Sequence, residues 1–127
     1  MHTGPLNWPG GEHDFALNIG QLRALQDSCN AGPEEVFNRL RLGNWRVNDL
    51  IEPIRLGLIG SGAMTTQEAG PAVLALMNQH AIIEFKLTAI SILAAALLGV
   101  SGDPVGERPG TAPPENGGSV GSMEAAR

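Results

Sequence analysis

Four side chains of this 127-residue chain are the most apt to act as nucleophile, acid/base group or metal ligand: His2, His13, His80 and Cys29. The three histidines are scattered, and no two have the i, i+4 spacing that places metal ligands on one helix face. An enzyme would need a pocket that converges on His13 or His80. The sequence therefore predicts no catalytic residue, no metal site and no cofactor.

The single cysteine is also a poor candidate for chemistry. Cys29 ends an apolar stripe near the C-terminus of a predicted helix, where the pKa of a thiol is raised rather than lowered. We expect it to be a small buried hydrophobic residue. Having no second cysteine, the chain forms no internal disulfide. The glycine-rich residues 60–62 lack the GxxxxGK[ST] pattern of a phosphate-binding loop and are interpreted as a linker.

The overall charge excludes one broad class of partner. Eight Lys and Arg stand against 13 Asp and Glu, for a net charge of −5. A nucleic-acid binder needs a basic face to neutralise phosphates, so we expect no nucleic-acid binding. The longest apolar run, residues 87–100, is shorter than the roughly 20 residues that span a bilayer. No signal peptide is visible at the N-terminus, and we expect a cytoplasmic protein that binds no membrane.

A β-hairpin is predicted at the N-terminus. Pro9, Gly10 and Gly11 form a strong turn signal. Residues 12–19 alternate polar and apolar side chains, as a half-buried strand does, and residues 6–8 are the candidate partner strand. A lone hairpin is marginal in water, so it must pack on the rest of the domain.

Helical patterns fill the next part of the chain. A stripe of Ile19, Leu22, Leu25 and Cys29 follows a candidate cap at Asn18. A second helix begins at Pro33, carries Glu34 and Glu35 in its first turn, and stops at Gly43; its apolar face is Val36, Phe37 and Leu40.

Two further helices each contain a proline. The third has Asn48 as a candidate cap, and Pro53 is either a kink or the true first position with Glu52 as cap. The fourth opens with the capping-box spacing of Thr65 and Glu68, and Pro71 indicates a kink or a delayed start.

The last helix, residues 82–98, is apolar nearly all round, so it is central in a core or covered by a partner. From residue 101 the composition turns to Gly, Pro, Ser and Glu, which cannot build a core. The predicted fold is mainly α: a small bundle of four to five short helices with an N-terminal β-hairpin, over residues 1–100. Residues 101–127 are predicted to be a disordered Gly/Pro-rich tail.

Three aromatic residues are candidate partner-binding positions: Trp8, Trp45 and Phe85. The two tryptophans stand in turn-rich surroundings, where each either closes the edge of the core or anchors a partner. Phe85 belongs to the apolar last helix, part of which is a candidate docking surface because so small a domain has limited core.

The order of these features resembles a known group of proteins. A strand (residues 12–17), a short helix (21–26), the segments DLIEPIRLGLIG (49–60) and TTQEAG (65–70), and an apolar closing helix follow one another over residues 12–99. This arrangement is similar to the small tail proteins of gene transfer agents and related siphophages, described as tail tube-associated proteins or tail assembly chaperones. Pro53 and Pro71 interrupt two helices of the pattern.

The resemblance implies a non-enzymatic protein of phage-like tail morphogenesis. Such a chaperone holds the long, apolar tape measure protein soluble until tail tube subunits polymerise around it, so its partners would be tape measure and tail tube proteins. Its location would be the bacterial host cytoplasm or the particle. The alternatives are a structural minor tail component and an unrelated helical adaptor, and homo-oligomerisation stays open.

Overall fold

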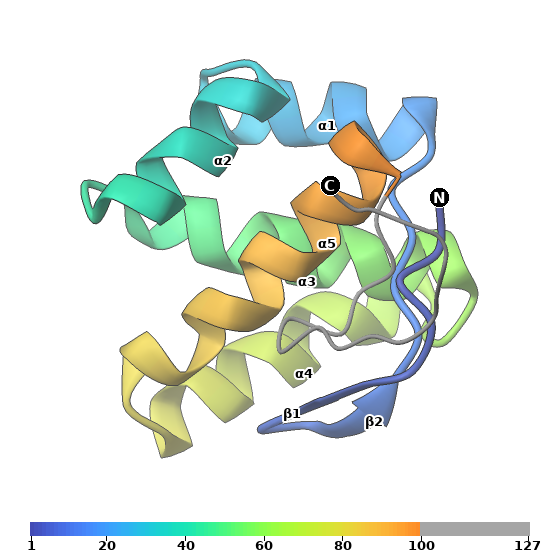
Figure 1. The fold of residues 1–127 in the computed structure, drawn as a ribbon. Helices are drawn as coiled ribbons and strands as arrows, with labels where there is room; N and C mark the ends of the chain where they lie inside the picture. The colour runs from blue at the N-terminus through green and yellow to red at the C-terminus, as the bar shows by residue number, and fades with distance from the viewer. Residues whose placement is uncertain (100–127) are drawn as a thin grey trace, which may run out of the picture.

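Five α-helices and one β-hairpin make up residues 1–99, the part of the chain described by the computed structural model (Figure 1). The elements are β1 (Leu6–Trp8), β2 (Gly11–His13), α1 (Ile19–Cys29), α2 (Pro33–Leu42), α3 (Val47–Ser61), α4 (Thr66–Gln79), the 3₁₀ turn η1 (Ile82–Phe85) and α5 (Lys86–Leu98). The predicted mainly α fold with an N-terminal hairpin is confirmed. The predicted tail, 101–127, lies outside the described residues, and the domain boundary at residue 100 remains a prediction.

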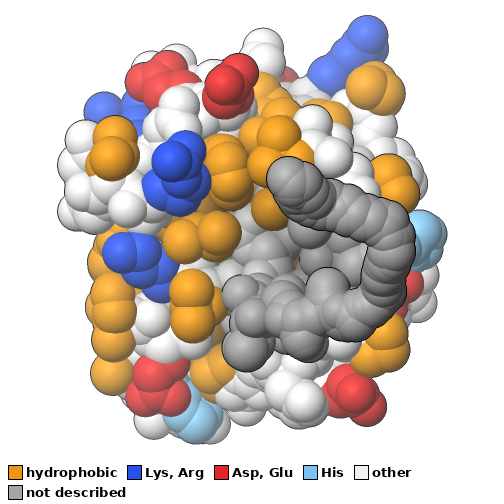
Figure 2. Space-filling model, viewed as in Figure 1, with side chains coloured by type: hydrophobic (Ala, Val, Ile, Leu, Met, Phe, Trp, Pro, Cys, Tyr) orange, Lys and Arg blue, Asp and Glu red, His pale blue; other side chains and the backbone are white. Residues whose placement is uncertain are grey.

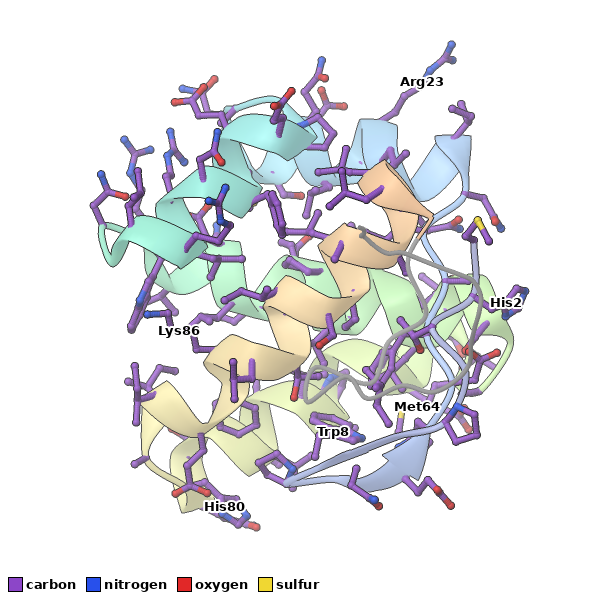
Figure 3. The ribbon with its side chains drawn as sticks, in the orientation of Figure 1. His2, Trp8, Arg23, Met64, His80 and Lys86 are labelled. Carbon is purple, nitrogen blue, oxygen red and sulfur yellow. The ribbon has the colours of Figure 1, made fainter. Side chains whose placement is uncertain are left out.

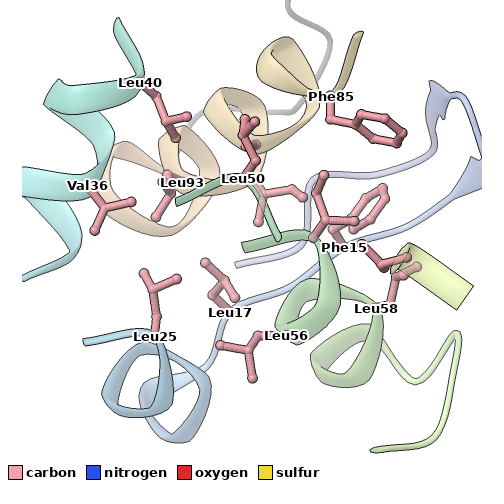
Figure 4. Packing of buried hydrophobic residues seen from close by; sticks show 14 of the residues in the cluster. Phe15, Leu17, Leu25, Val36, Leu40, Leu50, Leu56, Leu58, Phe85 and Leu93 are labelled. Atoms are coloured by element: carbon pink, nitrogen blue, oxygen red, sulfur yellow. The ribbon is translucent and has the colours of Figure 1, made fainter. Parts of the chain in front are cut away.

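Helix α3 is the centre of the fold. It packs against α1, α2, α4 and α5, and α5 crosses it at the front of Figure 1. Leu50, Ile54 and Leu58 of α3 are fully buried. Figure 4 shows how side chains from α1, α2, α3 and α5 converge on one core, among them Leu25, Val36, Leu40, Leu50 and Leu93.

The hairpin forms as predicted, but its second strand is shorter than the alternating pattern indicates. Leu6 pairs with His13 and Trp8 with Gly11. The strand expected over residues 12–19 is wrong beyond His13, apart from an isolated bridge between His2 and Ala16. Alternation fails because Phe15, Ala16 and Leu17 are all buried, so both sides of this extended segment face protein.

The segment around Phe15 is held between the N-terminus and α3. The backbone N–H of Thr3 donates to the Phe15 carbonyl at 2.8 Å, and the N–H of Ala16 donates to the Gly57 carbonyl of α3 at 3.0 Å. A Cβ atom at Gly60 would lie 1.9 Å from the Ala16 carbonyl oxygen, and one at Gly57 would lie 3.1 Å from the Phe15 side chain. Two glycines one turn apart therefore let a backbone segment lie directly on the helix.

Most of the predicted helix starts are confirmed. The Gln21 side chain accepts from the Asn18 N–H at 3.0 Å, and Pro33 is the first residue of α2. Thr65 and Glu68 form the predicted reciprocal capping box at 3.0 and 3.2 Å. These starts depend on residues three apart in sequence, so they can be predicted locally.

The two prolines lie inside their helices. Helix α3 begins at Val47, where the Asp49 carboxylate accepts from the Arg46 N–H at 2.8 Å, so Asn48 as cap and Pro53 as first residue are both wrong. Helix α4 begins at Thr66, which rules out the delayed start at Pro71. An interior proline removes one backbone hydrogen bond, and burial of α3 on several sides offsets that loss.

The ends of the described chain lie close together. Met1 is near Gly99, since a Cβ at that glycine would be 3.4 Å from the Met1 Sδ. His2 Nδ1 contacts Asp14 Oδ2 at 2.5 Å, and another oxygen of Asp14 accepts from the Gly4 N–H at 3.0 Å. The N-terminal residues are thereby fixed beside the end of α5 (Figure 1).

Replacing Gly60 by alanine tests the contact between α3 and the Phe15 segment. We expect Gly60→Ala to lower the free energy of unfolding by about 1–3 kcal/mol, because the new methyl group would overlap the Ala16 carbonyl oxygen. Gly20→Ala in α1 is the matched control: it meets no atom within 4 Å and should be neutral or stabilising by up to about 1 kcal/mol. Urea denaturation measures both variants, and equal stability of the two would contradict the contact.

Candidate protein-interaction surface

A row of apolar side chains runs along the outside of α5. It consists of Ile83, Leu87, Ile90, Ala94 and Leu98, and we call it the α5 stripe. Ile83, Leu87 and Leu98 are exposed, Leu87 to 62%, and the other two are half-buried. Intervals of three and four residues keep Leu87, Ile90, Ala94 and Leu98 on one face of α5, and Ile83 lies in the preceding turn η1. Contiguous exposed apolar surface of this kind marks interaction sites on monomeric proteins.

In part of α5, polar side chains are buried and apolar side chains are exposed, the reverse of the usual arrangement. Its two hydroxyl residues, Thr88 and Ser91, are only 7% and 5% exposed, while leucine faces the solvent. Buried Ser and Thr are tolerated in a helix since their hydroxyls can bond to the backbone of the preceding turn. A helix that evolved only to cover the core would place these residues outward. The inversion therefore indicates that the outer face of α5 is suited to contact with protein.

The surface around the stripe is apolar with a basic margin. Figure 2, in the orientation in which α5 is at the front, shows hydrophobic side chains over α5 and beside it, with Lys and Arg side chains between them on the α2 side. Lys86, the first residue of α5, lies on that side in Figure 3.

Two of the three predicted partner-binding residues lie in the core. Phe85 is fully buried, and Trp8 is 8% exposed with its ring edge-on to Phe15 and Phe85 at centroid distances of 5.6 and 6.3 Å. The Trp8 Nε1–H donates to His13 Nδ1 at 2.9 Å. A partner bound to the surface of the folded chain would therefore touch neither ring. A role of Trp8 and Phe85 in binding remains a prediction, and it would require the chain to unfold locally around them.

Trp45 is half-buried and lies in the turn between α2 and α3, packed against the core. The structure therefore brings Trp8 and Phe85 together but does not bring Trp45 into that cluster. The sequence indicated that part of the last helix could be a docking surface, but it did not identify the residues of the α5 stripe. The signal that could have found it is the pairing of outward leucines with Thr88 and Ser91 within one helix.

The buried charged groups are satisfied within the chain. Asp49 is fully buried and accepts from the Arg46 N–H and from Arg39 Nη1, at 2.8 and 3.4 Å. Burial alone would raise the pKa of the Glu52 carboxyl, but its two hydrogen bonds from Arg55, at 2.9 and 2.7 Å, hold that pKa below its usual value. These carboxylates are structural.

Cys29 is a buried thiol, and the described residues form no group of metal ligands. Burial and the neighbouring Asp49 carboxylate raise the pKa of the Cys29 thiol to about 12, so it stays protonated at neutral pH. Within residues 1–99, no three His, Cys, Asp or Glu side chains are grouped as metal ligands. No helix in the same range has the length and apolar character to cross a membrane.

The profile of the family described as "Phage tail tube protein, GTA-gp10" matches residues 4–99. The chain belongs to this family. The match takes in both strands, all five described helices and the α5 stripe. It confirms the resemblance to gene transfer agent and phage tail proteins. No curated protein and no solved structure matches the chain. Membership of the GTA-gp10 family indicates tail proteins as partners and association with the particle.

The burial of Cys29 in this GTA-gp10 family member makes a chemical prediction. With its pKa moved from 9.0 to about 12, the folded protein holds about a thousandfold less thiolate than the unfolded chain at pH 8. Iodoacetamide should therefore modify the native protein far more slowly than the protein in guanidinium, as followed by mass spectrometry. Equal rates in the two conditions would contradict the burial.

The same shift sets a direction for alkaline stability. Because the folded-state pKa is raised, the contribution of the thiol to stability is complete below pH 9 and is lost as the pH rises towards 12. A Cys29→Ala variant should lose less stability than the natural chain over that window.

Proposed function

We propose that this protein is a non-enzymatic tail assembly chaperone that binds an apolar helical segment of the tape measure protein through the α5 stripe. The observation that supports this most is an exposed apolar helix face in a member of a phage tail family. A tape measure protein is a long helical chain with much apolar surface. A chaperone for it must cover that surface while the tail tube is incomplete.

The geometry of the stripe suits a helical partner. From Ile83 to Leu98 it extends over 16 residues, or about 22 Å at roughly 1.5 Å per residue. Its first four members are separated by four, three and four residues, the spacing with which two helices pack knobs into holes. An amphipathic helix with the same spacing would bury its apolar face here, as in other helix-in-groove complexes.

The size of the stripe supports reversible binding. A stable protein complex buries about 800 Å² on each partner. One row of side chains on one short helix offers less than that, so a single contact would be weak and many copies along a tape measure would act together. Weak individual contacts favour displacement when tube subunits polymerise.

A structural role in the tail is the second candidate, because the family is described by the tail tube itself. In that case the α5 stripe would contact a neighbouring subunit of the finished particle. The two roles differ in one measurable way: a chaperone is absent from purified particles, whereas a structural component remains. Immunoblotting of purified particles against assembly extracts separates them.

Removing one leucine from the stripe tests the binding surface. We expect Leu87→Ser to weaken co-purification with co-expressed tape measure protein about tenfold, because burying a leucine contributes about 1.5–3 kcal/mol. Leu74→Ser is the control, an exposed leucine on α4, which packs mainly on α3. It should leave co-purification unchanged.

The readout is the amount of soluble tape measure protein retained on the tagged chain. Both leucines are exposed, so neither variant should alter the thermal unfolding midpoint by more than a few degrees. Equal retention by the natural chain and Leu87→Ser, with both folded, would refute the proposed surface.

A further inference from the structure

A second exposed apolar surface lies where α2 ends and α3 begins. It comprises Phe37, Arg41, Leu42, Trp45, Arg46 and Val47, and we call it the turn patch. Leu42 is 75% exposed, the most of any large hydrophobic residue in the described part of the chain, and Val47 is 55% exposed. Phe37 and Trp45 are half-buried and pack against the core.

The backbone of this turn is held in place. Gly43 adopts a left-handed conformation with φ of 86°, and the N–H groups of Gly43 and Asn44 both donate to the Arg39 carbonyl, at 3.0 and 3.1 Å. The N–H of Arg46 donates to the buried Asp49 carboxylate at 2.8 Å. Leu42 and Val47 are therefore displayed on a fixed turn, which lowers the ordering entropy that a binding partner would have to overcome.

The positive charges of the turn patch have no acidic partners of their own. Arg39 is bound to Glu35 and Asp49 at 3.0 and 3.4 Å. By contrast, Arg41 donates to the Asn38 amide oxygen at 2.9 Å and lies over the Phe37 ring at 5.4 Å. Among residues 1–99, neither Arg41 nor Arg46 forms a salt bridge.

We propose that the turn patch binds an acidic amphipathic segment of a partner protein. The partner's apolar side chains would cover Leu42 and Val47, and its carboxylates would pair with Arg41 and Arg46. Charge complementarity carries this assignment: in a chain of net charge −5, two arginines without salt bridges flank its most exposed leucine in sequence, at the turn between α2 and α3. Guanidinium groups bind carboxylates with two parallel hydrogen bonds, which fixes the register of a bound peptide.

This surface is separate in its chemistry from the α5 stripe and does not depend on the proposed chaperone role. The stripe is a row of apolar side chains along a helix, whereas the turn patch is a compact apolar pair with a cationic rim. A chain with both could hold two different segments at once. Linking two weak contacts raises overall affinity without any new contact.

Two synthetic helical peptides provide the probe. Both carry the same leucine stripe, flanked by glutamates in one and by lysines in the other, and each is labelled for fluorescence anisotropy against the full chain at low salt. Any contact of the leucine stripe with the α5 stripe is common to the two peptides, so we expect the glutamate peptide to bind about tenfold or more tightly than the lysine peptide. The Arg41→Glu/Arg46→Glu double variant and Leu42→Ser should each weaken binding about tenfold or more.

Two controls separate this surface from others. Arg23→Glu removes an exposed arginine from α1 and should leave the preference for the glutamate peptide over the lysine peptide unchanged, as should Leu87→Ser on the α5 stripe. Circular dichroism establishes that each variant is folded. If the double charge reversal unfolds the chain, the milder Arg41→Gln/Arg46→Gln variant takes its place and should still lose most of the binding.

Three results would overturn the proposal. Equal binding of the glutamate and lysine peptides would show that charge does not select the partner. Unchanged binding by folded variants of Arg41 and Arg46 would show that the peptide does not bind at the turn patch. Binding of the chain to phosphatidylserine vesicles through these residues, with no binding to the glutamate peptide, would assign the patch to an anionic lipid surface instead.

Discussion

The contact between the Ala16 backbone and α3 is the constraint on which the rest of the fold depends. The Ala16 N–H donates to the Gly57 carbonyl at 3.0 Å, and no Cβ fits at Gly60. This close approach carries Phe15 and Leu17 into the core on either side of Ala16. Through Thr3 and the hairpin it also ties the first residues of the chain to the central helix. Helices α1, α2, α4 and α5 all pack on α3. The backbone contact between Ala16 and α3 therefore fixes the position of the hairpin and the N-terminal segment relative to all the helices.

Helix α5 is less fully covered than α3. Within residues 1–99, α3 packs against four other helices, whereas α5 packs on α2 and α3 and leaves Leu87 and Leu98 exposed. Thr88 and Ser91 of the same helix are buried. Among these residues of α5, burial therefore does not follow polarity.

Local features of this fold could be predicted from sequence, while features set by tertiary contact could not. The Thr65–Glu68 box, Pro33 at a helix start and the turn at Pro9–Gly11 depend on neighbouring residues, and all three are present. Pro53 could be placed only as one of two alternatives, inside the helix or at its start, because the packing that offsets the cost of an interior proline is not visible in the sequence. The extended segment at Phe15 resembled a strand because alternation does not reveal which partner accepts its N–H groups. Ile19 was expected on the apolar stripe of α1, yet it is 67% exposed. The burial of Trp8 and Phe85 also depends on tertiary contacts, so it could not be predicted from the turn-rich sequence around Trp8 or the apolar sequence around Phe85.

The proximity of Met1 and Gly99 makes the described chain nearly a closed ring. A short linker between these residues would join the two ends without moving any helix, and a new pair of ends could be opened in an exposed turn elsewhere. Such a circular permutant would preserve the order of contacts in space while changing the order of synthesis. It would also keep a terminal fusion away from the end of α5, since an affinity tag on Met1 would begin beside Gly99.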